Sequence, residues 1–513
     1  MPNNCTRQRL WGFIANTKAG YRLFLHPLSK IPGPWYAAVS SFYEFWHDCI
    51  KEGRYFVKIE EMHEKYGPVI RINPYEVHIN DPAFFDTIYS NSQMHKVYRY
   101  YRGLGVDTGT VSSISAQQHR LRRGALAQFF SGANVKKLEH RVLSRVEQFC
   151  GRVEEYEERN MPIQCFNAYR SFATDVVTDY AVPKTRNFLA EPDFNAKVHG
   201  ILRNAGRVIC WNRHFPIITP IIRWTALTVP PSWIASLDPS GASLDFIENQ
   251  ADLLSQAQAA VNGDYEKETP TVIGALVKNP SLPPSERSYA RIADETVTVI
   301  AAGTETTGNT LTILTYHILA NPSVHKALKG ELTKAASKHG MVAPGMLTSK
   351  IVYSLPYLQG CVKEGLRMAS GVSGRLPRCH PTESLSYTTP EGKQYVFRPG
   401  TALSMFLHDV HFSTSIFPEP NTFDPNRWLT GSPEMIAHLE KHLVPFGKGV
   451  RQCVALELAK QEIILMIANL FWKFDLELFE TTERDIAYEH DYFSSFAGIQ
   501  SKGVRIVAKS SVS

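Results

Sequence analysis

The chain has 513 residues, of which 43% are hydrophobic and 20% are charged, and its 55 Lys and Arg against 49 Asp and Glu give a formal net charge of +6. This composition excludes a disordered or low-complexity chain and is sufficient for a sizeable hydrophobic core. The charge excess is too small to indicate a dedicated nucleic-acid-binding protein. The length permits either one large domain or about three domains of ~150 residues each.

The first 30 residues form an N-terminal segment without a clear membrane span. Arg7, Arg9 and Lys18 interrupt its apolar runs well before the roughly 18 residues that a transmembrane helix needs. Residues 31–35 read IPGPW, which predicts a rigid turn that ends any preceding helix.

Helical patterns dominate the rest of the chain. Apolar positions at three- and four-residue spacing predict helices over residues 56–66, 116–160, 290–320, 322–338, 355–368 and 454–473. Alternating patterns predict strands over residues 69–79, 385–396 and 503–508. Residues 214–233 are rich in Pro, Ile and Trp, and we expect a loop there whose apolar surface packs on the core or touches a membrane interface.

One cysteine stands in an unusual context. No two of the eight cysteines are closer than Cys150 and Cys165, which excludes a C-x-x-C zinc site. Cys453 lies in the segment PFGKGVRQCVA, residues 445–455, directly before an apolar helical pattern. We expect backbone amides at the helix start, together with Arg451, to favour the Cys453 thiolate. A single thiolate cannot complete a zinc site, but it can be the one protein ligand of a porphyrin iron.

The pattern F-x-x-G-x-R-x-C, with Phe446, Gly449, Arg451 and Cys453, resembles the cysteine loop of the cytochrome P450 family, the haem-thiolate monooxygenases. The family loop continues with a glycine two residues after the cysteine, where this chain has Ala455. This departure affects the close packing of the helix beside the haem, and not ligation of the iron. The resemblance implies that Cys453 is the iron ligand.

Two further segments fit the same resemblance. Glu364 and Arg367 form a Glu-x-x-Arg pair on one helix face, which alone is most often a solvent-exposed pair. Residues 423–428, FDPNRW, are similar to a family segment whose arginine joins this pair. The resemblance therefore implies a buried network of Glu364, Arg367 and Arg427 behind the cysteine loop.

Residues 302–307, AGTETT, place a glycine and hydroxyl side chains inside a long helical pattern, where they permit a local distortion of the helix. The acid–alcohol pair Glu305 and Thr306 resembles the family motif that relays protons during oxygen activation. Cleavage of an O–O bond requires protons in an otherwise dry pocket, so we expect a polar patch at this point of an apolar helix.

The haem propionates need cationic or hydrogen-bonding partners. His119 and Arg123 stand where the family has Trp-x-x-x-Arg, and Arg378 matches the arginine of a strand that reaches a propionate. The resemblance implies that these residues and Arg451 bind the haem. We interpret Arg120 and Arg122 as surface charges.

The resemblance, which spans residues 21–510, implies a mainly α fold with small β-sheets, and a single catalytic domain over residues 31–513. The implied reaction inserts one oxygen atom from O2 into a hydrophobic small molecule. NADPH would supply electrons through a separate reductase, because the chain has no dinucleotide-binding fingerprint. Residues 21–28, YRLFLHPL, look like those of fungal trichodiene-oxygenase-like members that serve secondary metabolism, which favours a terpenoid or polyketide substrate.

Family positions also suggest where the partners bind. The expected substrate contacts are residues 101–114, Thr298 with Ala302, residues 372–374 and residues 493–496. A basic face for the reductase is expected from Lys448, Arg451, Lys136 and Lys137. We expect an intracellular protein, either cytoplasmic or at the surface of the endoplasmic reticulum with peripheral membrane contact.

Two alternatives remain open at this point. A haem-thiolate isomerase or dehydratase would use Cys453 without a reductase, although the intact Glu305–Thr306 pair argues against it. A non-catalytic binding module would use the basic stretch of residues 120–145 for an acidic partner, but it explains none of the spaced motifs.

Overall fold

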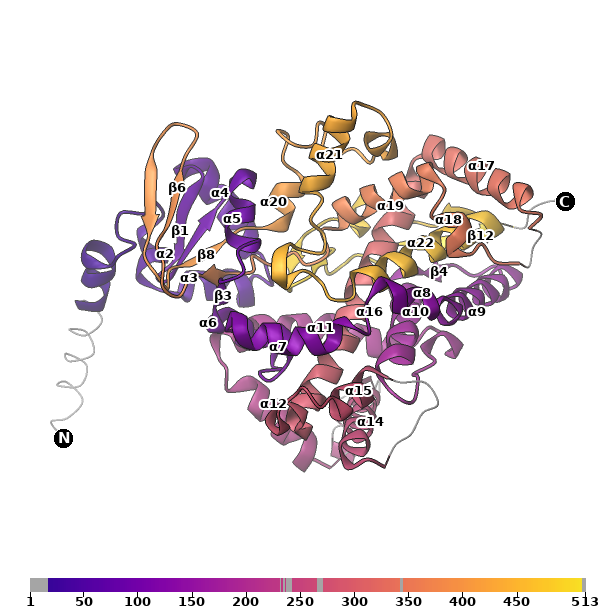
Figure 1. The fold of residues 1–513 in the computed structure, drawn as a ribbon, viewed down its shortest axis with the longest axis horizontal. Helices are drawn as coiled ribbons and strands as arrows, with labels where there is room; N and C mark the ends of the chain where they lie inside the picture. The colour runs from indigo at the N-terminus through magenta and orange to yellow at the C-terminus, as the bar shows by residue number, and fades with distance from the viewer. Residues whose placement is uncertain are drawn as a thin grey trace.

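The computed structural model describes residues 17–230, 232–233, 236, 242–264, 271–341 and 345–509 (Figure 1). The first 16 residues of the N-terminal segment lie outside the described residues. The helices are α2 (Trp35–Val39), α3 (Phe42–Phe45), α4 (Tyr55–Tyr66), α5 (Phe85–Tyr89), α6 (Tyr98–Tyr101), α7 (Ala116–Ala127), α8 (Gly132–Lys137), α9 (Glu139–Glu158), α10 (Cys165–Ala181), α11 (Ala196–His214), α12 (Ile218–Thr228), α14 (Ala242–Asn262), α15 (Val272–Lys278), α16 (Tyr289–Ala320), α17 (Pro322–Lys338), α18 (Ser349–Val352), α19 (Pro356–Ala369), α20 (Leu407–His411), α21 (Pro433–His442) and α22 (Leu456–Lys473). The strands are β1 (Val69–Asn73), β2 (Glu76–Ile79), β3 (His95–Lys96), β4 (Ile163–Gln164), β5 (Arg378–Cys379), β6 (Leu385–Thr388), β7 (Gln394–Phe397), β8 (Ala402–Ser404), β9 (Asp475–Leu478), β10 (His490–Asp491), β11 (Ser495–Phe496) and β12 (Arg505–Lys509).

The mainly helical fold with small sheets is confirmed, and most of the expected helices are present. The long pattern over residues 116–160 is divided into α7, α8 and α9, because the chain turns near Ser131 and again near Leu138. The expectation of a loop over residues 214–233 is wrong for most of that segment, since residues 218–228 form α12. Proline at position 220 lies in the first turn of α12, where its missing N–H costs no helical hydrogen bond.

The largest sheet gathers strands from distant parts of the chain in the order β1-β2-β8-β5-β3. It lies at one side of the molecule, with α2 to α5 around it and the larger helical part beside it (Figure 1). The edge pair β3 and β5 is antiparallel, and its register places Lys96 opposite Arg378. The sheet therefore brings two cationic side chains to neighbouring positions at the boundary with the helical part.

The helix α16 runs through the helical part and packs on α10 and α19 (Figure 1). Two of its glycines permit the close approach of α10. A Cβ added to Gly303 would lie 2.9 Å from a methyl group of Val177, and one added to Gly308 would lie 2.6 Å from Cγ and 3.2 Å from the backbone of Arg170. The packing of α10 against α16 thus explains why glycine, despite its low helix propensity, stands inside this helix.

None of the described helices is long and apolar enough to cross a membrane.

We predict that Gly308→Ala destabilises the protein by about 1–3 kcal/mol, because the added Cβ meets backbone atoms of α10 that cannot rotate away. The matched control is Gly330→Ala in α17, where no atom lies within 4 Å of the added Cβ. That substitution is expected to stabilise the protein by about 0.5–1 kcal/mol, since alanine has the higher helix propensity. Urea unfolding of both variants measures the difference, and equal midpoints would contradict the close-packing explanation.

Candidate functional site

The segment around Cys453 is a tight loop that precedes α22. Gly447 and Gly449 both have left-handed backbone angles, with φ of 67° and 66°, which glycine adopts without strain. The Cys453 N–H donates to the Phe446 carbonyl over 2.9 Å and closes the loop. Gly449 also allows a close approach, because a Cβ there would lie 2.7 Å from the Tyr89 carbonyl oxygen. The helix begins at residue 456, slightly later than expected, so that Cys453 projects from the loop.

The Cys453 side chain faces a hollow inside the protein. Burial among protein atoms raises the pKa of its thiol, yet the side chain is exposed. From these two observations we infer that the thiol lines a recess enclosed by protein, and we call this recess the hollow. Ala301 and Ala302 are exposed in the same way, although they lie in the middle of the largely buried α16. These exposed positions in the interior indicate room for a bound group between the loop and α16.

The thiolate expected from the sequence is not favoured by the protein alone. The Ala455 backbone N–H and the charge of Arg123 lower the pKa of Cys453, but the effect of burial is larger. Arg451, which we expected to stabilise the thiolate, instead donates to backbone carbonyls elsewhere. A bound metal cation would supply the missing positive charge, since a coordinated thiol is deprotonated.

Positively charged side chains converge beside this hollow. Lys96 and Arg378 occupy opposite positions of the β3–β5 pair, where like charges repel each other. His119 lies close to both and to Arg123 and Arg451; its burial, and then these four charges, lower the pKa of His119 to about 3. Within the described part of the chain, no carboxylate forms an ion pair with any of the four. Such a cluster requires an anion that the protein itself does not provide.

Individual contacts of these cations point to the same conclusion. Arg451 donates to the carbonyls of Ser113 and Ile114 over 3.0 and 2.9 Å, and Arg123 donates to the Gln452 carbonyl over 3.2 Å. The Nε atoms of both arginines are buried without a hydrogen-bond partner. A hollow with a cysteine thiol at one point and cations without a carboxylate partner at another is chemically suited to a haem, because a thiolate can ligate iron and cations can pair with propionates.

The polar patch of α16 is arranged differently from our expectation. Thr306 donates to the Ala302 carbonyl one turn earlier over 2.9 Å, which is the back-bonding that distorts helices. Glu305 does not lie free beside it. Its carboxylate accepts from Nε and Nη2 of Arg170 in α10 over 2.8 and 2.5 Å. Glu305 is therefore held by a bidentate ion pair with a fully buried arginine.

The structure brings together the three residues of the expected buried network. Arg367 donates to both carboxylate oxygens of Glu364 over 3.0 and 2.7 Å, and Arg427 donates to one of them over 3.3 Å. Glu364 and Arg367 are completely buried, so this is not a solvent-exposed helix pair. The Trp428 indole N–H also donates to Glu364, over 2.9 Å. The carboxylate is thus saturated by donors from α19 and from the segment before α21.

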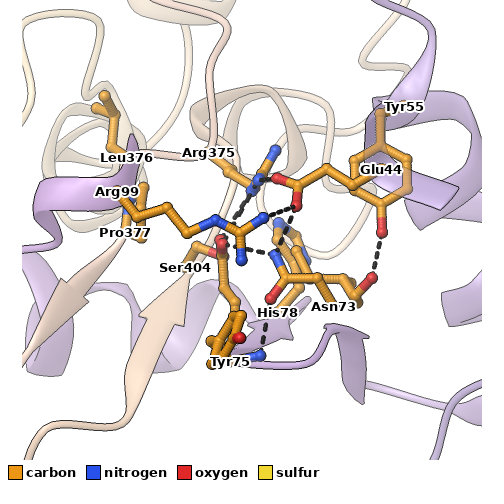
Figure 2. Close-up of polar contacts among 12 residues, drawn as sticks. Glu44, Tyr55, Asn73, Tyr75, His78, Arg99, Arg375, Leu376, Pro377 and Ser404 are labelled. Carbon is orange, nitrogen blue, oxygen red and sulfur yellow. Dashed lines mark hydrogen bonds and ion pairs between the residues drawn. The ribbon is translucent and has the colours of Figure 1, made fainter. Parts of the chain in front are cut away.

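A second buried charge cluster holds the chain just before Arg378. Figure 2 shows Arg375 against the Glu44 carboxylate, with Arg99 and Asn73 donating to that carboxylate over 3.2 and 3.1 Å. Arg375 also donates to Glu76 over 2.7 Å. The cluster ties α3, β2 and the segment after α19 together. It also restrains Leu376, whose positive φ of 41° is costly for a residue with a side chain.

One expectation about surface charge is wrong. Arg120 is exposed, but Arg122 is buried and forms a bidentate ion pair with Glu286 over 2.7 and 2.9 Å. Arg145, in the same basic stretch, is paired with Asp179 over 2.8 Å. Helix packing turns these side chains inward, so the stretch over residues 120–145 presents less free charge than its sequence indicates.

The expected substrate-contact segments lie against each other in pairs. Residue Val372 forms a β-bridge with Ser494, and the Ser373 N–H donates to the Phe493 carbonyl over 3.2 Å. Residues 108–110 contact α16 beside Thr298, because a Cβ on Gly109 would lie 2.9 Å from the Thr298 hydroxyl.

Three residues of this site were not expected from the sequence: Lys96, Arg170 and Trp428. Lys96 and Arg170 have no neighbouring motif, and their partners lie far away in the chain. Trp428 is adjacent to Arg427 in the segment that we singled out, so its indole N–H was the one signal available.

Comparisons with known proteins agree with this geometry. The chain matches the cytochrome P450 family over residues 39–500. It is 36% identical to cytochrome P450 monooxygenase MO6277 of Ascocoryne sarcoides, with 95% of each chain covered. It is 32% identical to cytochrome P450 monooxygenase TRI4 of Fusarium sporotrichioides, with 92% of this chain and 88% of that protein covered. Conidiogenone synthase of Penicillium rubens is also 32% identical, with 95% of both chains covered.

Proposed function

The chain belongs to the cytochrome P450 family and is a haem-dependent monooxygenase, and from this we propose that its substrate is a hydrophobic fungal secondary metabolite, a terpenoid or a polyketide. The names of the relatives support a role in secondary metabolism, since one of them is a conidiogenone synthase. The observation that carries the assignment is the hollow with Cys453 on one side and unpaired cations on the other. The relatives favour a monooxygenase over an isomerase, a dehydratase or a binding module.

We assign the haem-binding residues as follows. Cys453 holds the iron, and the left-handed glycines of its loop fix the direction of its sulfur. For the propionates we propose the cations Arg123, Arg378 and Arg451 together with the neutral His119, and we add Lys96, which lies beside them. Phe446 packs against the core beside the loop. When bound, the haem supplies the activation of dioxygen, and the protein supplies position, charge and protons.

The proposed role of Thr306 and Glu305 is to hold and move protons on the α16 side of the hollow. The Thr306 hydroxyl donates its proton to the Ala302 carbonyl. The hydroxyl oxygen can therefore accept a hydrogen bond from a donor in the hollow. Arg170 holds Glu305 at both carboxylate oxygens, which fixes the direction of this side chain. Glu305 would therefore pass a proton only when it leaves Arg170.

The family uses a reductase as its electron donor, and we propose that this chain receives electrons from NADPH through such a separate enzyme. Lys136 and Lys137 are exposed and Lys448 is half-buried, which supports a basic docking face. Arg451 does not belong to that face, because it donates to carbonyls of residues 113 and 114 inside the protein. Lys448 is paired with Asp86 over 2.7 Å and must leave that partner to engage the reductase. NADPH consumption by the purified chain without reductase would contradict this proposal.

We also propose that the protein rests on the surface of the endoplasmic reticulum through an apolar face. Phe24, Trp35 and Trp224 are 78%, 68% and 65% exposed. Ring contacts join the N-terminal part of this face to the end of α11. The ring of Phe45 in α3 lies 5.5 Å from the ring of Trp211 and 5.4 Å from that of Phe215. Large exposed aromatic side chains are enriched at membrane interfaces, which supports this proposal.

The iron ligand is tested by Cys453→Ser. The expected result is loss of the thiolate-type optical band of the reduced carbon monoxide complex, because a serine hydroxyl does not replace a thiolate as ligand. The control is Cys379→Ser, which changes a half-buried cysteine outside the loop and is expected to keep the band. Persistence of the band in Cys453→Ser would refute the ligand assignment.

The proton-relay role is tested by Thr306→Ala in turnover reconstituted with NADPH and reductase. We expect the carbon monoxide spectrum to stay intact and product formed per NADPH to fall about tenfold or more, with peroxide released instead. Thr310→Ala is the matched control, since Thr310 makes the same kind of bond one turn later, donating to the Thr306 carbonyl over 2.8 Å. Equal coupling in both variants would exclude the role of Thr306.

Membrane contact is tested by sedimentation of the full chain with phosphatidylcholine vesicles. The double variant Phe24→Ser with Trp224→Ser is expected to lower vesicle binding about tenfold or more, because it removes two large exposed apolar side chains. Tyr353→Ser, directly after α18 (Ser349–Val352), is the control, because Tyr353 is 46% exposed and α18 lies far from the N-terminal helices (Figure 1). This variant is expected to bind like the parent chain. Binding that is equally weak or equally strong in all three proteins would overturn the proposed face.

A further inference from the structure

Residues 108–114 form a loop that lies between α16 and the cationic cluster. The loop contains a short helical turn, Thr110–Ser112, and ends just before α7. Its backbone donors and acceptors are bonded to different partners on its two sides. The position of the loop is therefore determined by α16 on one side and by the cationic residues on the other.

On the α16 side, two adjacent carboxylates hold two threonines. Oδ2 of Asp294 accepts from the backbone N–H and the hydroxyl of Thr108 over 2.9 and 2.6 Å. Oε2 of Glu295 accepts from the backbone N–H and the hydroxyl of Thr110 over 2.9 and 2.7 Å. Hydrogen bonds to charged acceptors are the stronger kind, and each threonine is held at two points.

Buried arginines fix one of these carboxylates in turn. Arg291 donates to Glu295, and over 3.0 Å to the hydroxyl of Thr110. Arg291 and Arg122 share Glu286, at 3.1 and 2.7 Å. Since Arg122 also donates to the Ser113 hydroxyl over 3.1 Å, the loop is supported by charged groups along its whole length.

On the other side, loop carbonyls accept from the cations that we assign to the haem propionates. The backbone N–H of Lys96 donates to the Ile114 carbonyl over 3.0 Å, and its ammonium group donates to the Val111 carbonyl. Arg451 donates to the carbonyls of Ser113 and Ile114. The loop therefore connects α16 to the cationic cluster.

The loop lies where it limits the hollow. Gly109 contacts Thr298, which follows Asp294 by one helical turn, and Ala302 follows Thr298 by another. Residues at this spacing share a helix face, and the distance along α16 from Asp294 to Ala302 is about 12 Å. Ala302 is one of the exposed residues of α16 from which we infer the hollow. The wall formed by residues 108–114 thus begins within a small molecule's length of the proposed site of oxidation.

We propose that Asp294 and Glu295 are positioning residues, which fix the loop of residues 108–114 over α16 and thereby determine how large a molecule the cavity accepts. This inference rests on the proposed function, because it takes the hollow as the substrate cavity. The carboxylates touch neither haem nor substrate. They act through the threonines that they hold.

The experiment removes one hydroxyl donor at a time and uses probes of different size. Thr108→Val and Thr110→Val delete the side-chain bonds to Asp294 and Glu295 with little change in shape. Imidazole and 4-phenylimidazole bind the haem iron and are titrated optically. Imidazole is expected to bind within about twofold of the parent protein, whereas the ratio of the two dissociation constants changes about fivefold or more, the effect expected of one lost hydrogen bond.

Conservative variants and a remote control separate positioning from general damage. Thr108→Ser and Thr110→Ser keep the hydroxyl and are expected to restore the parent ratio. Thr430→Val, which removes a local bond to the Asn426 carbonyl at an exposed site, is expected to leave the ratio unchanged. Thr108 is half-buried, so its valine variant remains informative if the more buried Thr110→Val does not fold. Hydrogen exchange should show faster exchange of the amides over residues 108–114 in the valine variants only.

The outcomes distinguish this inference from the function on which it rests. If the parent protein shows no optical shift with imidazole, the haem assignment itself fails. If the parent responds but the valine variants keep its probe ratio, or weaken both probes equally, the positioning role is overturned. A changed ratio that serine restores, with faster exchange confined to the loop in the valine variants, establishes it.

Discussion

The site depends on positive charges that the fold holds together and that pair with no carboxylate among the residues that the structure describes. Lys96 and Arg378 face each other across β3 and β5, and His119 is kept neutral by burial and by the cations around it. Repulsion in this cluster costs free energy in the chain alone, and a dianionic cofactor reverses the sign of that contribution. We therefore expect haem binding and the stability of the fold to be coupled.

The same hollow is bounded by a helix in which both polar residues of the proposed proton path are held in place. In α16, Thr306 bonds back to its own helix, and Glu305 is paired with Arg170 of α10. The close packing of α10 at Gly303 and Gly308 is what brings Arg170 within reach. The elements that shape the proposed proton path are thus also those that pack the core, which limits how far this region can vary without loss of stability.

Two saturated carboxylates connect the site to the rest of the fold. Glu364 accepts from Arg367, Arg427 and Trp428 behind the cysteine loop, and Glu44 joins Arg375 to the N-terminal helices just before the strand that carries Arg378 (Figure 2). Each carboxylate is buried and accepts from several donors, so loss of one donor leaves part of the hydrogen-bonding capacity of a buried charge unsatisfied. These clusters act at a distance from the haem by fixing the segments that reach it.

Local sequence was sufficient for Cys453 and its loop, because the glycines, the arginine and the cysteine are contiguous and their spacing determines the backbone turn. It was also sufficient for the helical pair of Glu364 and Arg367, whose spacing sets a common face. Other contacts depend on the packing of elements that are distant in the chain. Only this packing places Lys96 opposite Arg378. It also forms the ion pair of Arg170 with Glu305 and the hydrogen bond from Thr108 to Asp294. Such contacts join residues up to several hundred positions apart, and no periodicity along the chain records which of its charged side chains will meet once the helices and strands have packed.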